Sequence, residues 1–157
     1  MAKSQRVDGL RKQHFGEVPS FNPRLGGYSA VPWVYRTLLA AFTPREWMVL
    51  SYLYLRSGPE GITWLTDETI GTDIGIGRKK LGPHIKRLVE MGFIVAKRLG
   101  RQRYIKLVDP MSLAEKLVTS PSFLTPEQQQ RLAQDLEQIW RTRRSRARDL
   151  NEADPAE

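Results

Sequence analysis

The sequence predicts a mainly α-helical fold with one small antiparallel β-hairpin and a C-terminal helical extension. Residues 43–46 (TPRE) and 125–128 (TPEQ) both have the capping-box pattern, in which Glu or Gln follows a Thr N-cap by three positions. Two β-rich runs on either side of Gly100, FIVAKRL and RYIKLV, predict the hairpin. A chain of 157 residues with 40% hydrophobic content is long enough for one domain with extensions and a real core.

Residues 1–27 are polar and rich in Gly and Pro, and we expect a flexible basic N-terminal arm there. An arm of this kind either contacts a binding partner or has no role. Its basic side chains include Lys3, Arg6, Arg11 and Lys12. From Tyr28 the chain turns apolar, which predicts a short extended piece broken by Pro32 and then a helical turn or two.

The first long helix is predicted over residues 44–56, with the wide apolar face that is typical of a core helix. Residues 62–64 are long enough only for a short strand, and we place Trp64 in the core. Thr66 is the expected N-cap of a second helix, which carries two acids in its first turn, where the helix dipole favours them. This helix is predicted to stop near Gly75.

A third helix is predicted from Gly77 to about Met91, with Gly92 as its C-cap. Its buried stripe is expected to consist of Leu81, Ile85, Leu88 and Val89. Pro83 interrupts the pattern, because proline removes one backbone hydrogen bond and collides with the preceding turn. We therefore expect either a kink or a helix that starts properly only near Pro83.

The hairpin is followed by further helices. Alternation along its two strands predicts that the side chains facing inward are Ile94, Ala96, Ile105 and Leu107. Asp109 is the expected N-cap of a short helix to about Val118, and the second capping box opens a helix to about Arg148. The chain is thus divided into a domain at 28–109, a C-terminal helical extension at 110–150 and an acidic tail at 151–157.

The formal net charge of +8 is concentrated in one block. Residues 76–106 hold ten basic side chains and only one acidic side chain, Glu90, and the rest of the chain is close to neutral. A solvated surface usually mixes both signs of charge, whereas a block this one-sided predicts a surface that binds a polyanion.

The order helix, short strand, helix, tight turn, basic helix and basic hairpin is that of a winged helix-turn-helix. An α-helix fits the major groove of double-stranded DNA, and Lys and Arg hold phosphates. The DNA-binding candidates on the third helix, the recognition helix, are Arg78, Lys79, Lys80, His84, Lys86 and Arg87. The candidates on the hairpin, the wing, are Lys97, Arg98, Arg101 and Arg103.

The stretches YSAVPWVYRTLLAAFTPREWMVL, TWLTDETIGTDIGIGRKKLGPHIKRLVEMGFI and VAKRLGRQRYIKLV resemble the winged helix-turn-helix domain of bacterial transcriptional regulators and of plasmid or phage replication initiators. The similarity covers about residues 28–108. It implies the winged fold and double-stranded DNA as the partner. The sequence departs from the family at Gly77, where a Ser or Thr usually caps the recognition helix.

Three functions follow from these observations. The first is a sequence-specific double-stranded DNA-binding protein that acts as a transcriptional regulator. The second is a non-catalytic origin- or centromere-binding protein in plasmid or phage replication or segregation. The third is a winged-helix protein–protein adaptor. The positive charge of both the recognition helix and the wing argues against this third function.

The last helix carries a short apolar stripe. Its members, which are candidates for a homodimer contact, are Leu132, Leu136, Ile139 and Trp140. The stripe is too short for a confident coiled coil, so packing against the chain's own domain is the alternative. Five Arg within residues 141–148 contact either DNA or solvent.

The sequence offers little support for enzyme chemistry. It has no Cys, only two His (His14 and His84) and no phosphate-binding loop, so we expect no cofactor, no metal site and no catalytic activity. No apolar run approaches the length of a membrane span, and the N-terminus has no secretion signal. We therefore expect a cytoplasmic protein, and the sequence leaves any small-molecule effector open.

Overall fold

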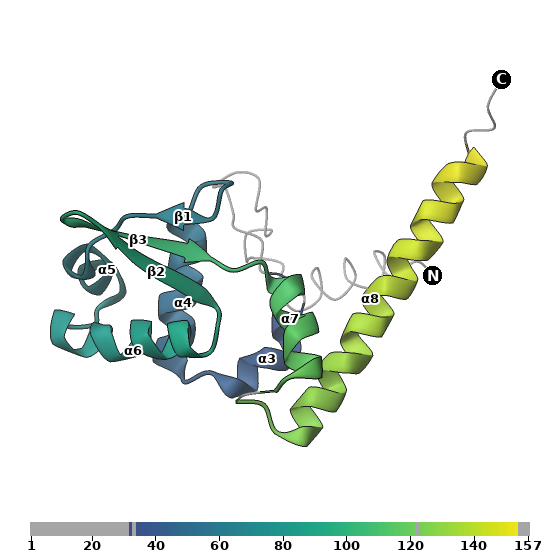
Figure 1. Ribbon diagram of the computed structural model, residues 1–157, viewed down its shortest axis with the longest axis horizontal. Helices are drawn as coiled ribbons and strands as arrows, with labels where there is room; N and C mark the ends of the chain where they lie inside the picture. Colours follow the sequence, from purple (N-terminus) through teal and green to yellow (C-terminus); the bar gives the residue numbers. More distant parts are fainter. Residues whose placement is uncertain (1–31, 33, 122, 154–157) are drawn as a thin grey trace, which may run out of the picture.

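The computed structural model describes residues 32, 34–121 and 123–153. In chain order its elements are α3 (Tyr35–Leu38), the 3-10 helix η1 (Leu39–Ala41), α4 (Pro44–Arg56), β1 (Ile62–Thr63), α5 (Asp67–Ile74), α6 (Arg78–Glu90), β2 (Ile94–Leu99), β3 (Gln102–Leu107), α7 (Pro110–Thr119) and α8 (Pro126–Ala153). The segment from α4 to β3 has the topology of a winged helix-turn-helix, and α7 and α8 form the helical extension (Figure 1). The predicted arm, residues 1–27, lies outside the described residues.

Both predicted capping boxes are confirmed. At the start of α4, Thr43 Oγ1 accepts a hydrogen bond from the Glu46 amide at 3.2 Å, and Glu46 Oε2 accepts one from the Thr43 amide at 2.8 Å. At the start of α8, Thr125 and Gln128 exchange the same pair of hydrogen bonds at 3.2 and 3.0 Å. The N–H groups that a helix N-terminus leaves without intrahelical partners are thus partly satisfied by local sequence alone.

The sheet has three antiparallel strands in the order β1-β3-β2. In the hairpin, Ile94 pairs with Leu107 and Ala96 with Ile105, which confirms the predicted inward alternation. Thr63 in β1 is buried, so the next residue, Trp64, points to the opposite face, with 60% of its surface exposed. The prediction of Trp64 as a core residue is therefore wrong.

One hydrophobic core contains residues from each of the helices that the structure describes and from the hairpin. Near its centre Tyr35 of α3 packs against Phe93 with ring centroids 5.7 Å apart, and its hydroxyl lies 2.8 Å from that of Tyr54. Burial raises the pKa of the Tyr35 hydroxyl well above its usual value. Leu132 and Leu136 of α8 belong to the same core, so the extension completes the core of the winged domain.

Helix α8 is joined to α3 and then extends away from the domain (Figure 1). The buried carboxylate of Asp135 accepts a hydrogen bond from Arg36 Nη2 at 2.7 Å and another from the hydroxyl of Thr37. Beyond this anchor the helix continues to Ala153, into the segment 151–157 that the sequence predicts as an acidic tail. Among the described residues, no helix combines the length and apolar character needed to cross a membrane.

Candidate nucleic-acid interface

The turn between α5 and α6 determines where the recognition helix begins. Gly75 ends α5 in the left-handed region (φ 72°), and the Ile76 amide donates to the carbonyl of Gly71 at 2.9 Å. A Cβ on Gly71 would lie only 2.4 Å from the carbonyl oxygen of Ile76, so this close approach requires glycine. The buried side chain of Ile76 fills the space below the turn. The first turn of α6 is therefore held firmly against α5.

Arg78, Lys79 and Lys80 form this first turn, and all three are exposed. The N-cap, Gly77, contributes no side-chain hydrogen bond, as its residue type predicts. The helix then runs unbroken through Pro83 to Glu90, so the alternative of a helix that starts near Pro83 is wrong. Gly at position 82 removes one obstacle, because the proline ring clashes with the Cβ of the preceding residue and Gly has none.

The opposite sides of α6 differ in character. Leu81, Ile85 and Leu88 are buried, whereas 39% of the surface of Val89 is exposed. The prediction of Val89 in the buried stripe is wrong because the positions that face the core follow i, i+4 and i+7, which leaves Val89 at its margin. The exposed side presents Lys79, Gly82, Pro83, Lys86 and Glu90 to solvent.

The remaining basic candidates of α6 have protein neighbours. Lys86 Nζ lies 3.9 Å from Glu90 Oε1, one turn further along the same helix. Arg87 Nε lies 4.0 Å from Glu46 Oε1, a buried carboxylate that belongs to the capping box of α4. His84 is half-buried. Lys86 and Arg87 are exposed but have acidic neighbours, whereas no ion pair is found for the three basic residues of the first turn among the described residues. Base reading by His84 stays a prediction.

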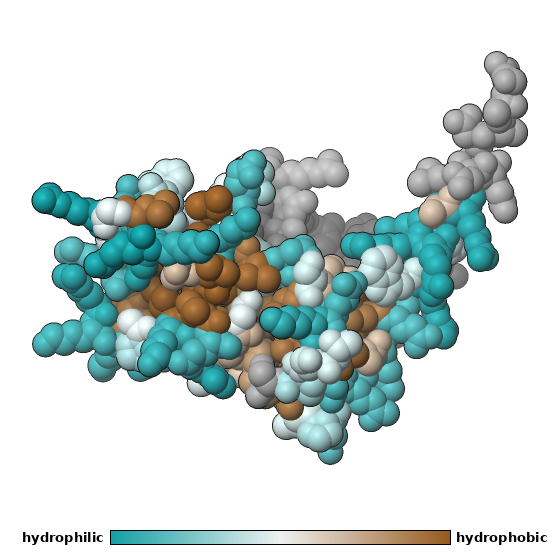
Figure 2. Space-filling model, viewed as in Figure 1, coloured by the Kyte–Doolittle hydropathy of each residue, from teal (hydrophilic) through white to brown (hydrophobic). Residues whose placement is uncertain are grey.

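The wing is a hairpin closed by a two-residue turn. Leu99 pairs with Gln102 across it, and Gly100 adopts a left-handed conformation (φ 63°) that glycine favours. Lys97, Arg98 and Arg101 are exposed around this turn. Figure 2 shows hydrophilic side chains projecting from this end of the molecule. The tip of the wing thus presents three cations to solvent.

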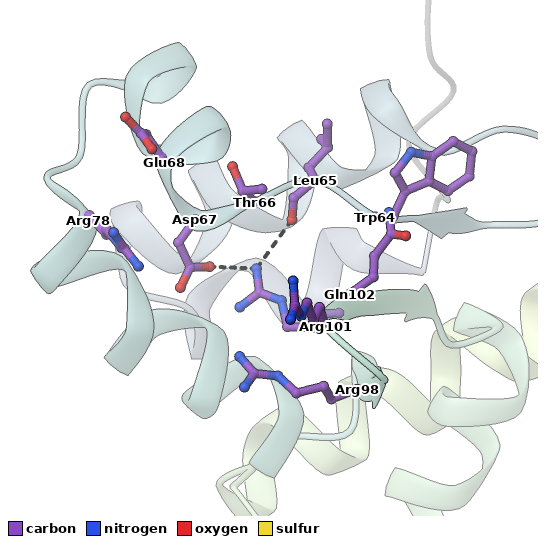
Figure 3. Close-up of a pocket in the computed structure, with 10 residues that line it drawn as sticks. Trp64, Leu65, Thr66, Asp67, Glu68, Arg78, Arg98, Arg101 and Gln102 are labelled. Atoms are coloured by element: carbon purple, nitrogen blue, oxygen red, sulfur yellow. Dashed lines mark hydrogen bonds and ion pairs between the residues drawn. The ribbon is translucent and has the colours of Figure 1, made fainter.

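Arg103, the fourth wing candidate, has a different environment. Its Nη2 lies 2.5 Å from Oδ1 of Asp67, the first residue of α5, and 3.4 Å from the carbonyl oxygen of Leu65 (Figure 3). About a quarter of the Arg103 side chain is exposed. This ion pair links the wing to the start of the helix-turn-helix. Sequence reasoning missed the role of Asp67, because no local pattern relates a helix N-terminus to a strand so distant along the chain.

A cleft of about 540 Å³ separates the wing from α5 and α6. Arg78 reaches it from the first turn of α6, and Arg98 and Arg101 reach it from the wing (Figure 3). Asp67 and Glu68 lie on the wall formed by α5. The structure therefore brings together side chains from both predicted basic clusters around a single hollow. No group of three His, Cys, Asp or Glu that could hold a metal occurs in the described part of the chain.

The four dimer candidates on α8 do not share one environment. Leu132 and Leu136 are buried in the chain's own core. For these two residues, packing against the chain's own domain is therefore the correct alternative. Ile139 is half-buried, and 41% of the surface of Trp140 is exposed. The guanidinium of Arg143 lies 5.4 Å from the centroid of the Trp140 ring. Only the second half of the stripe is thus available to another molecule.

No family model and no curated protein matches the chain. Among solved structures it is similar to MepR, a transcription regulator of the Staphylococcus aureus multidrug efflux pump MepA, with 14% identity, 90% of this chain and 98% of that chain covered and a TM-score of 0.40. It is also similar to a MarR transcriptional regulator from Methanosarcina mazei Go1, with 16% identity, 81% and 94% coverage and a TM-score of 0.38. These values are too low to carry an argument about function. The class, a winged-helix protein with a basic helix and wing, rests on this chain's own topology and side chains.

Proposed function

We propose that this protein binds double-stranded DNA at specific sequences and regulates transcription. The observation that supports it most strongly is the shared cleft, into which the first turn of α6 and the wing both direct arginine side chains. The exposed first turn of α6 has the size and charge to enter a major groove. The wing cations lie beside the first turn of α6. With this turn in a major groove, they would meet the phosphate backbone or the adjacent groove.

Within this proposal the residues divide into two groups. Arg78 and Lys79 lead into the groove and read bases, because the N-terminal residues of a recognition helix contact base edges. Lys97, Arg98 and Arg101 hold the backbone through the wing and give affinity without sequence preference. Transcription regulation is the proposed role, since a protein that occupies a chosen site controls access to a neighbouring promoter.

The salt dependence of DNA binding tests the proposal. We expect log affinity to fall linearly with log salt concentration, with a slope of roughly 0.9 per phosphate neutralised. Arg101→Ala is expected to weaken binding to all sequences alike and to lower this slope by about one. Arg78→Ala is expected to change the preferred sequence in a selection of bound fragments.

The matched control is Lys116→Ala, which removes one exposed cation from α7, away from the wing tip and the first turn of α6 (Figure 1). It should change neither slope nor preference. Weak binding that is independent of sequence would contradict the proposal and favour the adaptor. Bound sites confined to a replication origin or centromere, with none at promoters, would favour the segregation or replication role instead.

A further inference from the structure

Pro83 lies on the exposed side of α6, one turn after the basic residues 78–80. In a regular α-helix the N–H of residue 83 would donate a hydrogen bond to the carbonyl of residue 79. Proline has no N–H, so this bond is not made, yet the helix continues to Glu90. The carbonyl oxygen of Lys79 therefore lacks the donor that a regular helix would provide.

The surroundings of this carbonyl are open. Lys79, Gly82 and Pro83 are all exposed, and a Cβ placed on Gly82 would meet no atom within 4 Å beyond its two chain neighbours and the backbone of α6 itself. The side chains that pack against the core, such as Leu81 and Ile85, lie on the other side of α6. The ring of Pro83 lies beside the Lys79 carbonyl. A hydrogen-bond donor from another molecule can therefore approach this carbonyl from the Gly82 side of the ring without displacing a side chain of any other element.

Gly82 and Pro83 are also the two residue types that are least favourable inside a helix. They stand side by side on the face that presents the basic first turn. Pro83 is exposed, so no burial in the core explains it. A local rule that is broken at an exposed position without a packing reason is typical of a binding surface.

We propose that the backbone carbonyl of Lys79 reads a base, accepting a hydrogen bond from the exocyclic amino group of adenine or cytosine in the major groove. This inference rests on the DNA-binding function proposed above. Those amino groups are the hydrogen-bond donors that base edges offer in the major groove, since the polar groups of guanine and thymine there are acceptors. The missing side chain at Gly82 allows the helix backbone to approach the base edge closely enough for this contact.

A thermodynamic cycle between the protein backbone and one DNA amino group tests the inference. A set of DNA fragments is prepared from the selected site, and each fragment has one adenine or cytosine replaced by an analogue without the amino group. The analogue is purine for adenine and 2-pyrimidinone for cytosine. For the unaltered protein, deletion at one position is expected to lower affinity roughly tenfold, as for one good hydrogen bond to a base edge. In Pro83→Ala the restored N–H engages the Lys79 carbonyl, so the same deletion should have little effect.

A second variant separates the carbonyl from the proline ring. Pro83→lactic acid introduces a backbone ester, which lacks both the N–H and the ring, and it should respond to amino-group deletion as the unaltered protein does. Pro83→Ala should also unfold at a higher temperature, because Ala is favourable inside a helix and Pro is not. A loss of base discrimination in Pro83→Ala therefore cannot come from unfolding.

Three results would overturn the inference. One is a clear sequence preference in which every amino-group deletion has the same effect on the unaltered protein and on Pro83→Ala. This result would leave the DNA-binding function intact. Another is an ester variant that behaves like Pro83→Ala, which would assign the effect to the ring or the bend it causes. A third is an unaltered protein with no sequence preference, which would remove the proposed function together with this inference.

Discussion

Asp109 is the residue that ends the wing and begins α7. Its Oδ2 accepts hydrogen bonds from the amide of Ser112 at 2.8 Å and from its hydroxyl at 2.9 Å. These hydrogen bonds favour the ionised form and lower the pKa of Asp109 below its usual value of 3.8. A carboxylate with a lowered folded-state pKa stabilises the protein above its unfolded-state pKa, and this stabilisation is lost as the pH falls through the folded-state pKa.

Asp109→Ala is therefore expected to lower the free energy of unfolding by about 1 kcal/mol near neutral pH, which is typical for the loss of an N-cap. Urea unfolding measures this difference. The difference should shrink as the pH falls below 3.8 and through the lowered folded-state pKa, because the carboxyl group of the unaltered protein then becomes protonated. Asp109→Asn is the control, since it keeps an N-cap acceptor without the charge. An equal effect of Asp109→Ala at neutral and acid pH would contradict the assignment.

At the scale of elements, the ion pair between Arg103 and Asp67 fixes the wing relative to the helix-turn-helix. Both side chains are partly exposed, so the pair contributes little to stability, about 1 kcal/mol or less. We expect its main effect to be on position, because in the proposed function the wing tip and the first turn of α6 contact DNA at the same time. We therefore expect Asp67 to favour DNA binding, although it carries the same sign of charge as DNA.

Asp67→Asn is expected to weaken DNA binding, by about threefold to tenfold at moderate salt, because the wing loses its anchor on α5. Fluorescence anisotropy of labelled DNA measures the affinity. Electrostatics alone predicts the opposite result, since the change removes a negative charge that repels phosphate.

Glu68→Gln is the matched control for Asp67→Asn, because it removes the same charge from the next residue of the same cleft. It should strengthen binding slightly. If both variants strengthen binding equally, Asp67 has no positioning role.

Features that depend on neighbouring residues were predictable from the sequence. The starts of α4, α7 and α8 follow from Thr43, Asp109 and Thr125, since each cap acts within one helical turn. The inward alternation of the hairpin follows from the period of a strand, and the burial of Leu81, Ile85 and Leu88 follows from helical periodicity. The clustering of positive charge in residues 76–106 predicted which elements carry the exposed cations.

Features that depend on distant contacts were not predictable. The pairing of Arg103 with Asp67 requires the wing to fold back over α5, which no local pattern encodes. Trp64 is exposed because it points to the face opposite the buried Thr63, and which face of so short a strand is buried depends on its pairing with the distant strand β3. Pro83 was expected to interrupt the recognition helix or bend it, and tertiary packing of Leu81 and Ile85 holds the helix across it.

At the scale of the whole molecule, α8 has two parts with different surroundings. Its first half supplies Leu132 and Leu136 to the core, and its second half extends into solvent (Figure 1). The exposed side of the second half presents Trp140. Trp is typical of the residues that contribute most to protein interfaces. We therefore expect a homodimer contact to use the part of α8 after Gln138.

Deletion of residues 139–157 is expected to yield a folded monomer, and the full chain is expected to form a dimer. Light scattering measures the molar mass of both. The deletion keeps Leu132 and Leu136, so the core remains complete and circular dichroism should still show a cooperative unfolding transition. Trp140→Ala in the full chain should weaken the dimer without changing the fold. A full chain that is already monomeric would contradict the prediction.

Asp135 on α8 bonds to Arg36 and Thr37 on α3, which are 99 and 98 positions away along the chain. Closing so long a loop is entropically costly, and contacts between distant residues form late in folding. The contacts within the helix-turn-helix and the wing, in contrast, join residues that are closer along the chain, even where β1 pairs with β3. During synthesis the segment from α4 to β3 can therefore fold before α8 has left the ribosome. Until α8 arrives, the apolar side chains of α3 lack part of their cover, and this is when the chain is most exposed to aggregation.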